Sequence, residues 1–202
     1  MSMREIVDAF FRERSIVNHH LASFNDFLPT EDNRNSRMQR IVDEARVSED
    51  STERGIIRLD VQKTKSSIFV RVGRRRDKNG NVDPHDAPTI VVGPPFVKEA
   101  VGSKPSVTPM EARLRNLTYL APIDLTVTVV ENGVERAPET VHIGDIPVMV
   151  KSRLCSLHRA NIEKASTLVL SPEEYRAKLV EYGEDPLDPG GYFIIGGTER
   201  VI

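Results

Sequence analysis

The sequence predicts an α+β fold in which helices come first and a mainly antiparallel sheet with short capped helices follows. Two observations support this prediction. Apolar residues recur at helical spacing through residues 1–50, and at alternate positions from Ile57 onward. The helices expected later in the chain are short, and each begins with a capping signal.

The N-terminal segment, residues 1–50, is predicted to be helical. A first helix has Ile6 and Phe10 on one face. A second helix is expected to be capped by Ser15 and to end at Pro29, because proline cannot continue the hydrogen-bond ladder. A third, more polar helix fits Ser36–Val47.

The body, residues 51–202, begins with two runs of alternating apolar residues. They predict strands near Ile57–Gln62 and Ile68–Val72, paired as one antiparallel unit. Residues 73–88 are basic at first and then rich in Asn, Asp, Gly and Pro, which predicts an exposed loop. A short strand is expected at Ile90–Val92, followed by a break at Gly93–Pro95.

Two later helices carry N-terminal capping signals. Thr108 precedes Pro109 with Glu111 placed to complete a capping box, and Ser171 precedes Pro172 with Glu174 in the equivalent position. Between them, Pro122 is expected to end the segment that follows the first helix. A strand is therefore predicted only after Pro122, with a hairpin turn at Asn132-Gly133 and a returning strand.

The end of the chain is predicted to be a hairpin. A short strand at Tyr192–Ile195 is followed by a turn at Gly196-Gly197, and a second strand begins at Glu199. The second strand stops on two apolar residues, so we expect more polypeptide after Ile202. We therefore interpret residues 1–202 as a single domain that is incomplete at its C-terminus.

Composition excludes several classes of protein. The net charge is −2, which lacks the global basic excess of a dedicated nucleic-acid-binding domain. The single cysteine excludes an internal disulfide framework and a zinc site built from several cysteines. No apolar stretch approaches a membrane span, and no secretory signal is visible, so a soluble cytoplasmic protein is expected.

Several arginines are candidates for contact with phosphate. Arg71, Arg74, Arg75 and Arg76 make a local basic run that also includes Lys78. The alternative, equally weighted, is a solvated loop in which nearby acids, Asp77, Asp83 and Asp86, compensate the charge. Arg113 and Arg115 lie on the short capped helix, where each either contacts phosphate or pairs with a carboxylate.

Other motifs suggest chemistry but have simpler explanations. His19 and His20 are adjacent, so on a helix they point about 100° apart and do not chelate one ion. Cys155 and His158 lack a third ligand or an orienting acid, which favours a buried structural cysteine. The acids of the segment Glu184–Asp188 are expected to cap and turn rather than to catalyse. No catalytic residue and no metal ligand is predicted.

Four segments resemble a known family. They are Ser15–Phe27, Pro109–Pro122, Gly144–Met149 and Gly190–Ile202. In order and spacing they are similar to the start of the second-largest, beta-like subunit of multisubunit DNA-directed RNA polymerase, in its archaeal and eukaryotic branch. One departure is Gly196, where the family usually has Asn, a residue that orders tight turns by hydrogen bonding.

The resemblance implies a role inside a nucleotidyltransferase. The chain would be part of the protrusion, a wall beside the cleft for DNA and the RNA–DNA hybrid, and a docking surface for other subunits and for initiation and elongation factors. It implies no cofactor in this chain, with Mg²⁺ held by another subunit, and a place for Arg200 near the hybrid. The alternative is a stand-alone, non-enzymatic interaction domain related to that polymerase subunit.

Overall fold

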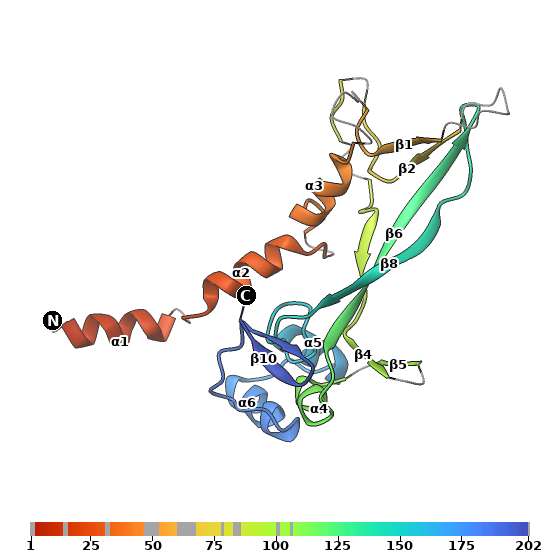
Figure 1. The fold of residues 1–202 in the computed structure, drawn as a ribbon. Helices are drawn as coiled ribbons and strands as arrows, with labels where there is room; N and C mark the ends of the chain where they lie inside the picture. The colour runs from red at the N-terminus through yellow and green to blue at the C-terminus, as the bar shows by residue number, and fades with distance from the viewer. Residues whose placement is uncertain are drawn as a thin grey trace. The chain divides into compact units, whose positions relative to one another are not determined.

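The computed structural model describes residues 3–13, 16–30, 33–46, 53–59, 68–77, 79–82, 86–99, 102–105 and 107–201. It confirms the α+β class (Figure 1). The chain forms two compact units. Unit 1 contains Met1–Asn25, Pro94–Ala121 and Asp145–Ile202, and unit 2 contains Asp26–Gly93 and Pro122–Gly144. Ser15, Val47, Lys78, Asp83 and the predicted strand beyond Leu59 lie outside the described residues.

The helices agree with most of the sequence predictions. The structure contains α1 (Met3–Glu13), α2 (Asn18–Phe27), α3 (Arg37–Asp43), α4 (Pro109–Leu114), α5 (Arg159–Ser166) and α6 (Pro172–Glu181). Helix α3 ends four residues before the predicted Val47. Helix α5 was not predicted, and its N-cap residue makes no side-chain capping bond that a sequence pattern could reveal.

Capping hydrogen bonds are present at three helices, and those of Thr108 and Ser171 were predicted from the sequence. The hydroxyl of Ser36 accepts from the N–H of Gln39 at the start of α3. Thr108 caps α4 in the same way. At α6, Ser171 accepts from the N–H of Glu174 at 3.2 Å, and the carboxylate of Glu174 accepts from the N–H of Ser171 at 2.7 Å. These reciprocal bonds form the capping box expected from the sequence.

Strand β6 (Tyr119–Glu131) is the centre of the larger sheet. Its partners are β2, β3, β4, β7 and β8, and it runs beside β8 in Figure 1. The other strands are β1 (Ile56–Leu59), β2 (Ile68–Arg71), β3 (Ile90–Val92), β4 (Phe96–Glu99), β5 (Gly102–Pro105), β7 (Val134–Glu135) and β8 (Glu139–Pro147). The predicted antiparallel pairing of β1 with β2 is confirmed.

The expectation that Pro122 interrupts the chain before a strand begins was wrong, because β6 continues through this residue. Opposite Pro122 the partner strand changes, since β3 has ended and β4 has not begun. The carbonyl of Pro122 still accepts from the N–H of Gly93 at 2.9 Å. A Cβ atom at Gly93 would lie 2.8 Å from the Pro122 ring, so glycine is required for this close approach.

Strands β4 and β5 were not predicted from the sequence. The sequence of β5 is Gly-Ser-Lys-Pro, and none of these residues favours a strand. Its extended form comes from antiparallel pairing along β4, from Phe96–Pro105 to Glu99–Gly102. Tertiary pairing therefore overrides local preference in this segment.

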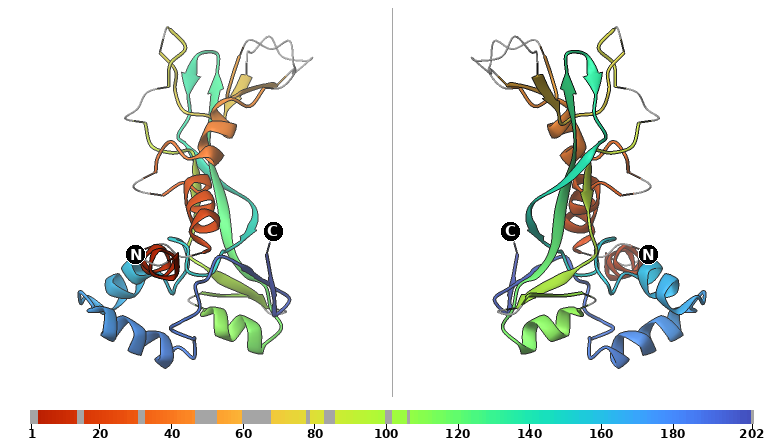
Figure 2. Two further views of the ribbon diagram at one scale, coloured as in Figure 1. Left: turned by 90° about the vertical axis from the view of Figure 1, so that its left-hand side faces the viewer. Right: turned by 90° about the vertical axis from the view of Figure 1, so that its right-hand side faces the viewer.

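The C-terminal hairpin was predicted correctly. Strands β9 (Phe193–Ile195) and β10 (Thr198–Arg200) pair in antiparallel register around Gly196-Gly197. Both glycines have positive φ, 57° and 74°, as a two-residue hairpin turn requires. Figure 2 shows this hairpin in the same part of the molecule as α4 and α6, which also belong to unit 1.

Each unit has its own buried apolar residues. In unit 1 they include Tyr119, Val148, Leu157, Leu179 and Ile194. In unit 2 they include Leu28, Met38, Val72, Ile90 and Val130. The described residues contain no helix that is both long and apolar enough to span a membrane.

Candidate functional site

Three of the family-like segments meet inside unit 1. The N–H of Val148 donates to the carbonyl of Tyr119 at 3.0 Å. A β-bridge joins Met149 to Phe193, and the N–H of Gly197 donates to the carbonyl of Leu117 at 2.9 Å. The segments around α4, the end of β8 and the β9–β10 hairpin therefore form one hydrogen-bonded block.

Arg113 on α4 connects this block through its side chain. Its guanidinium donates from Nη1 to both carboxylate oxygens of Glu184, at 2.8 and 3.0 Å, and from Nε to Glu199 at 2.8 Å. A fourth bond runs from Nη2 to the hydroxyl of Tyr192 at 2.7 Å. That hydroxyl donates in turn to Asp188. We call these five residues the Arg113 centre.

The Arg113 centre is partly buried and carries more negative than positive charge. The side chain of Arg113 is 18 % exposed and that of Glu184 only 4 %. Burial, followed by the hydrogen bond and charge of Asp188, raises the pKa of Tyr192, so the phenol stays neutral and remains a donor. Most of the N–H donors of the guanidinium are already used. This geometry therefore favours pairing of Arg113 with carboxylates over contact with phosphate.

The two other candidate arginines of unit 1 lie in different surroundings. Arg115 pairs with Glu111 one helical turn away, at 3.0 Å. Arg200, the last residue of β10, is exposed, and no ion pair joins it to a described residue. Its contact with nucleic acid stays a prediction, and so does that of Arg115.

Arg74 in unit 2 is buried against Asp43 of α3. Its Nη2 and Nε donate to Asp43 Oδ2 at 2.7 and 3.0 Å, and its backbone N–H donates to Oδ1 at 2.8 Å. Nη1 donates to Asn35, and the amide of Gln39 also donates to Asp43. Both charged side chains are only 3 % exposed. We call these four residues the Arg74 centre.

This burial argues against Arg74 as a phosphate ligand in this arrangement. Its guanidinium is already held by a carboxylate and an amide oxygen, and breaking a buried ion pair leaves an uncompensated charge. Glycine backbones approach closely here, since a Cβ atom at Gly73 would lie 3.1 Å from the Cα of Asp43. The site is therefore packed around the ion pair.

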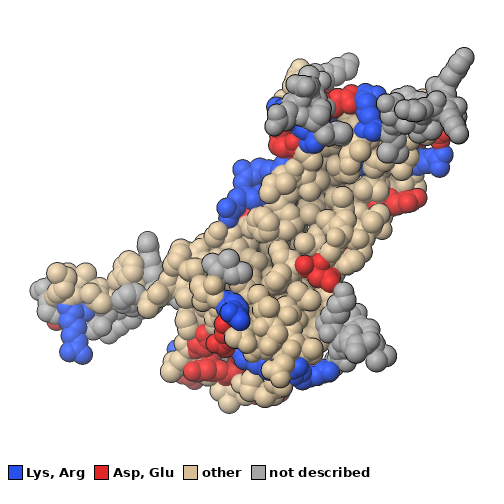
Figure 3. Space-filling model, viewed as in Figure 1, with Lys and Arg blue, Asp and Glu red and all other residues tan. Residues whose placement is uncertain are grey.

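The remaining arginines of the basic run bond to acids that are distant in sequence. Arg71 and Arg75 both bond to Glu135, at 2.9 and 2.5 Å. Arg76 bonds to Glu44 at 2.7 Å. The hydrogen bond from Arg71 is the main cause that lowers the pKa of Glu135. On the face drawn in Figure 3, basic and acidic side chains are interspersed.

The structure agrees only in part with the expectation that nearby acids compensate the positive charge of the basic run. Asp77 accepts from the N–H groups of Asn79 and Asn81 and closes its own turn. Asp86 accepts from the backbone N–H of Arg75 at 2.9 Å. The side-chain partners Glu44 and Glu135 carried no signal in the sequence, because they come from other elements. Arg71, Arg75 and Arg76 as contacts for nucleic acid stay predictions.

The other motifs occupy structural positions. The rings of His19 and His20 lie 4.1 Å apart. Cys155 is buried, and burial raises the pKa of its thiol, which disfavours the reactive thiolate. Burial also lowers the pKa of His158. Within the part of the chain that the structure describes, no group of three His, Cys, Asp or Glu side chains is placed to hold a metal ion.

The acids of the segment Glu184–Asp188 divide between two roles. Asp185 and Asp188 accept from the N–H groups of Leu187 and Gly190, which is the turn-forming role expected from the sequence. Glu184 instead reaches Arg113, which lies 71 positions earlier in the chain. The sequence contained no signal for this pairing.

Comparison with known proteins identifies the family. The model of the RNA polymerase beta subunit matches residues 15–202. The chain belongs to the RNA polymerase beta subunit family. The segments that carried the resemblance lie within the matched range, and three of them build the block around Arg113 in this member of the family.

Relatives of this RNA polymerase beta subunit family member come from several organisms. The chain is 38 % identical to DNA-directed RNA polymerase subunit Rpo2N of Methanothermobacter thermautotrophicus over 98 % of its length. It is 36 % identical to Rpo2N of Methanocaldococcus jannaschii over 99 % and to Rpo2 of Saccharolobus shibatae over 98 %. It spans 29 %, 32 % and 13 % of those three proteins, respectively.

Proposed function

We propose that this chain is the N-terminal part of the second-largest subunit of an archaeal-type DNA-directed RNA polymerase. The observation that carries the proposal is the alignment of nearly the whole chain, at 36–38 % identity, with polymerase subunits Rpo2 and Rpo2N. The chain then acts as part of a nucleotidyltransferase whose other subunits are its partners. It supplies no catalytic residue, and Mg²⁺ is held by another subunit.

Within that enzyme, the proposed role is architectural. The chain forms the protrusion, one wall of the cleft for DNA and the RNA–DNA hybrid, and a docking surface for initiation and elongation factors. Support comes from the two arginine centres, whose buried charges hold separate segments of the chain together. Such internal pairing suits a rigid wall better than a site that must rearrange around a substrate.

Arg200 is the arginine we propose for contact with the nucleic-acid backbone. It is exposed, and its side chain has no acidic partner among the residues that the structure describes. A guanidinium at that position is available for a charge-assisted bond to phosphate. The net charge of −2 predicts weak and salt-sensitive binding by the isolated chain.

The assembly proposal is tested by capture from native lysate with an antibody against this chain. We expect the antigen to co-purify with a many-subunit polymerase and to exceed 22.7 kDa, the mass of this chain. Recovery of the antigen alone, free of polymerase subunits, would support the stand-alone interaction domain instead.

The role of Arg200 needs a separate test in reconstituted polymerase. The variant Arg200→Gln is expected to shorten the lifetime of elongation complexes, with the larger loss at low salt, because a removed phosphate contact also lowers the salt dependence of binding. Arg176→Gln, which neutralises an exposed arginine on α6, is the matched control. Equal lifetimes for the two variants would contradict the assignment.

A further inference from the structure

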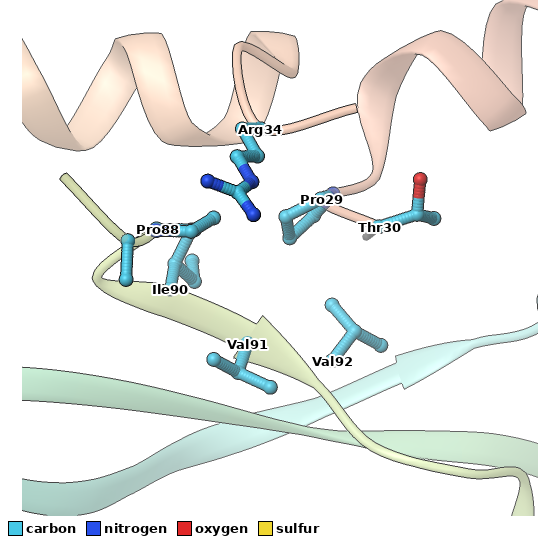
Figure 4. Close-up of a pocket in the computed structure, with 8 residues that line it drawn as sticks. Pro29, Thr30, Arg34, Pro88, Ile90, Val91 and Val92 are labelled. Carbon is cyan, nitrogen blue, oxygen red and sulfur yellow. The ribbon is translucent and has the colours of Figure 1, made fainter. Parts of the chain in front are cut away.

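A small cavity in unit 2 lies beside β3. Its volume is about 390 Å³, and its walls include Pro29 and Arg34 from the segment between α2 and α3, Pro88, and all three residues of β3. Figure 4 shows the Arg34 side chain extending into the space between Pro29 and Pro88 and toward β3. An arginine therefore reaches into a cavity with mainly apolar walls.

The hydrogen bonds of β3 show which of its edges is paired with β6. The N–H of Gly93 donates to the carbonyl of Pro122, and the N–H of Thr126 donates to the carbonyl of Thr89. The carbonyl of Thr89 and the N–H of Gly93 thus point toward β6, and Val91 lies between them opposite Asp124. Because these directions alternate along an antiparallel strand, Ile90 and Val92 direct their backbone groups to the opposite edge.

This second edge of β3 is only partly used. The side-chain oxygen of Gln39 accepts from the N–H of Ile90 at 3.1 Å. No described residue bonds to the carbonyl of Ile90 or to the N–H and carbonyl of Val92. All three residues of β3 line the cavity although their side chains alternate between two faces, as expected when a cavity follows a strand edge.

Arg34 adds a charge to this edge. Its side chain is exposed, and no described acidic group pairs with it. The neighbouring Arg37, by contrast, is bonded to Asp26 at 2.9 Å. Glu31 and Asp32, which precede Arg34, lie outside the described residues. A guanidinium at the rim of an apolar cavity is complementary to a carboxylate carried by an otherwise apolar ligand.

We propose that the cavity is a docking site for a short extended peptide segment of a partner protein that carries an acidic side chain between apolar residues. The segment adds to β3 by main-chain hydrogen bonds to the carbonyl of Ile90 and to the N–H and carbonyl of Val92. Its carboxylate bonds to Arg34, and its apolar side chains contact Pro29 and Pro88. This site is independent of the nucleic-acid and assembly roles proposed above.

The length of the free edge limits the segment. Pro88 precedes β3 and Pro94 follows it, and proline has no N–H with which to extend the ladder. A segment of only a few residues is therefore accommodated. Such a small contact predicts weak, reversible binding, as in transient signalling encounters.

The test is an NMR titration of the 202-residue chain with the peptide acetyl-Thr-Val-Glu-Val-Thr-amide. We expect saturable shifts of the Val92 amide and the Arg34 Nε–H. The same peptide with Gln in place of Glu is expected to bind about fivefold more weakly, the typical limit for an exposed ion pair. Methylation of the three central backbone nitrogens of the peptide is expected to abolish binding, because these groups can no longer donate to β3.

Two protein variants complete the test. Arg34→Gln is expected to remove the preference for Glu over Gln in the peptide, whereas Arg40→Gln, on the exposed side of α3, retains it. Unchanged thermal unfolding midpoints show that both variants remain folded. The proposal is overturned if the peptide does not bind, if the methylated peptide binds equally well, or if N-acetylglutamate alone reproduces the Arg34 shift with no further effect of the peptide at Val92.

Discussion

The two arginine centres both neutralise a guanidinium that is shielded from solvent, but they do so with different partners. The Arg74 centre buries one cation against one carboxylate, and both side chains are 3 % exposed. The Arg113 centre joins one cation to two carboxylates and a phenol, and Glu199 in it is 55 % exposed. Desolvation is therefore severe in the first centre and partial in the second.

This difference predicts how each centre responds to change. A buried pair tolerates no removal of one partner, because the remaining charge has no water to solvate it. A centre that is open to solvent on one side tolerates the loss of a bond, because water takes the place of the missing partner.

The largest effect is expected for Asp43→Ala, which leaves Arg74 buried without its carboxylate. We expect a loss of about 3–5 kcal/mol in the free energy of unfolding, measured by urea denaturation. The double variant Asp43→Ala with Arg74→Met is expected to recover part of this loss, because no uncompensated charge remains. A loss below about 1 kcal/mol, the range of exposed ion pairs, would place this centre with the exposed pairs of the surface.

A second effect concerns the hairpin that carries Glu199 to the Arg113 centre. A Cβ atom at Gly197 would lie 2.6 Å from the Cα of Asn116, whereas one at Gly196 meets nothing within 4 Å. Gly197→Ala is therefore expected to lower the free energy of unfolding by about 2 kcal/mol or more. Gly196→Ala is expected to lower it by about 1 kcal/mol, because of its positive φ alone. Thermal unfolding compares the two. Equal losses would show that the backbone at Asn116 yields easily.

Replacement of Arg113 by lysine tests how much the planar guanidinium group contributes to stability. Lysine keeps the charge but cannot bond Glu184, Glu199 and Tyr192 in the same geometry. We expect Arg113→Lys to lower the free energy of unfolding, measured by urea denaturation, by about 1–2 kcal/mol. This loss is smaller than that of Asp43→Ala because the centre is partly exposed. The matched control is Arg115→Lys, for which we expect little change. An Arg113→Lys loss as large as that of Asp43→Ala would remove the distinction between the two centres.

The smallest effect is expected at the surface of unit 2. The hydrogen bond from Arg71, opposed by slight desolvation, keeps the pKa of Glu135 below its usual range. A lowered folded-state pKa means that this stabilisation is present above the unfolded-state pKa and is lost as the pH falls through the folded-state value. Glu135→Gln is therefore expected to reduce the loss of stability between neutral pH and about pH 3. Identical pH profiles for the variant and the original chain would contradict this.

Gly196 occupies the turn position at which the family resemblance leads us to expect Asn. The family usually has Asn there, and the glycine adopts a φ of 57° in open space. Asn is tolerated in this left-handed conformation and is common in such turns. The departure therefore removes a possible ordering hydrogen bond but leaves the turn and its register with β9 and β10 intact.

The local features of this protein are encoded by residues that are neighbours in the chain. Capping by Thr108 and Ser171, the hairpin at Gly196-Gly197 and the pairing of β1 with β2 were all predicted, and the structure confirms them. Each depends on residues that are near one another in the chain, so local backbone preferences and the alternation of apolar residues are sufficient. The motifs that resemble the polymerase family are likewise recognisable from the sequence alone.

The partners of the arginines, in contrast, depend on the tertiary fold. Arg74 meets Asp43 from 31 positions away, and Arg113 meets Glu184 from 71 positions away. The passage of β6 through Pro122 and the strand formed by Gly102–Pro105 depend on their partners in the same way. The physical reason is that an arginine offers the same donors to phosphate, water or carboxylate, and the fold determines which acceptor lies within reach.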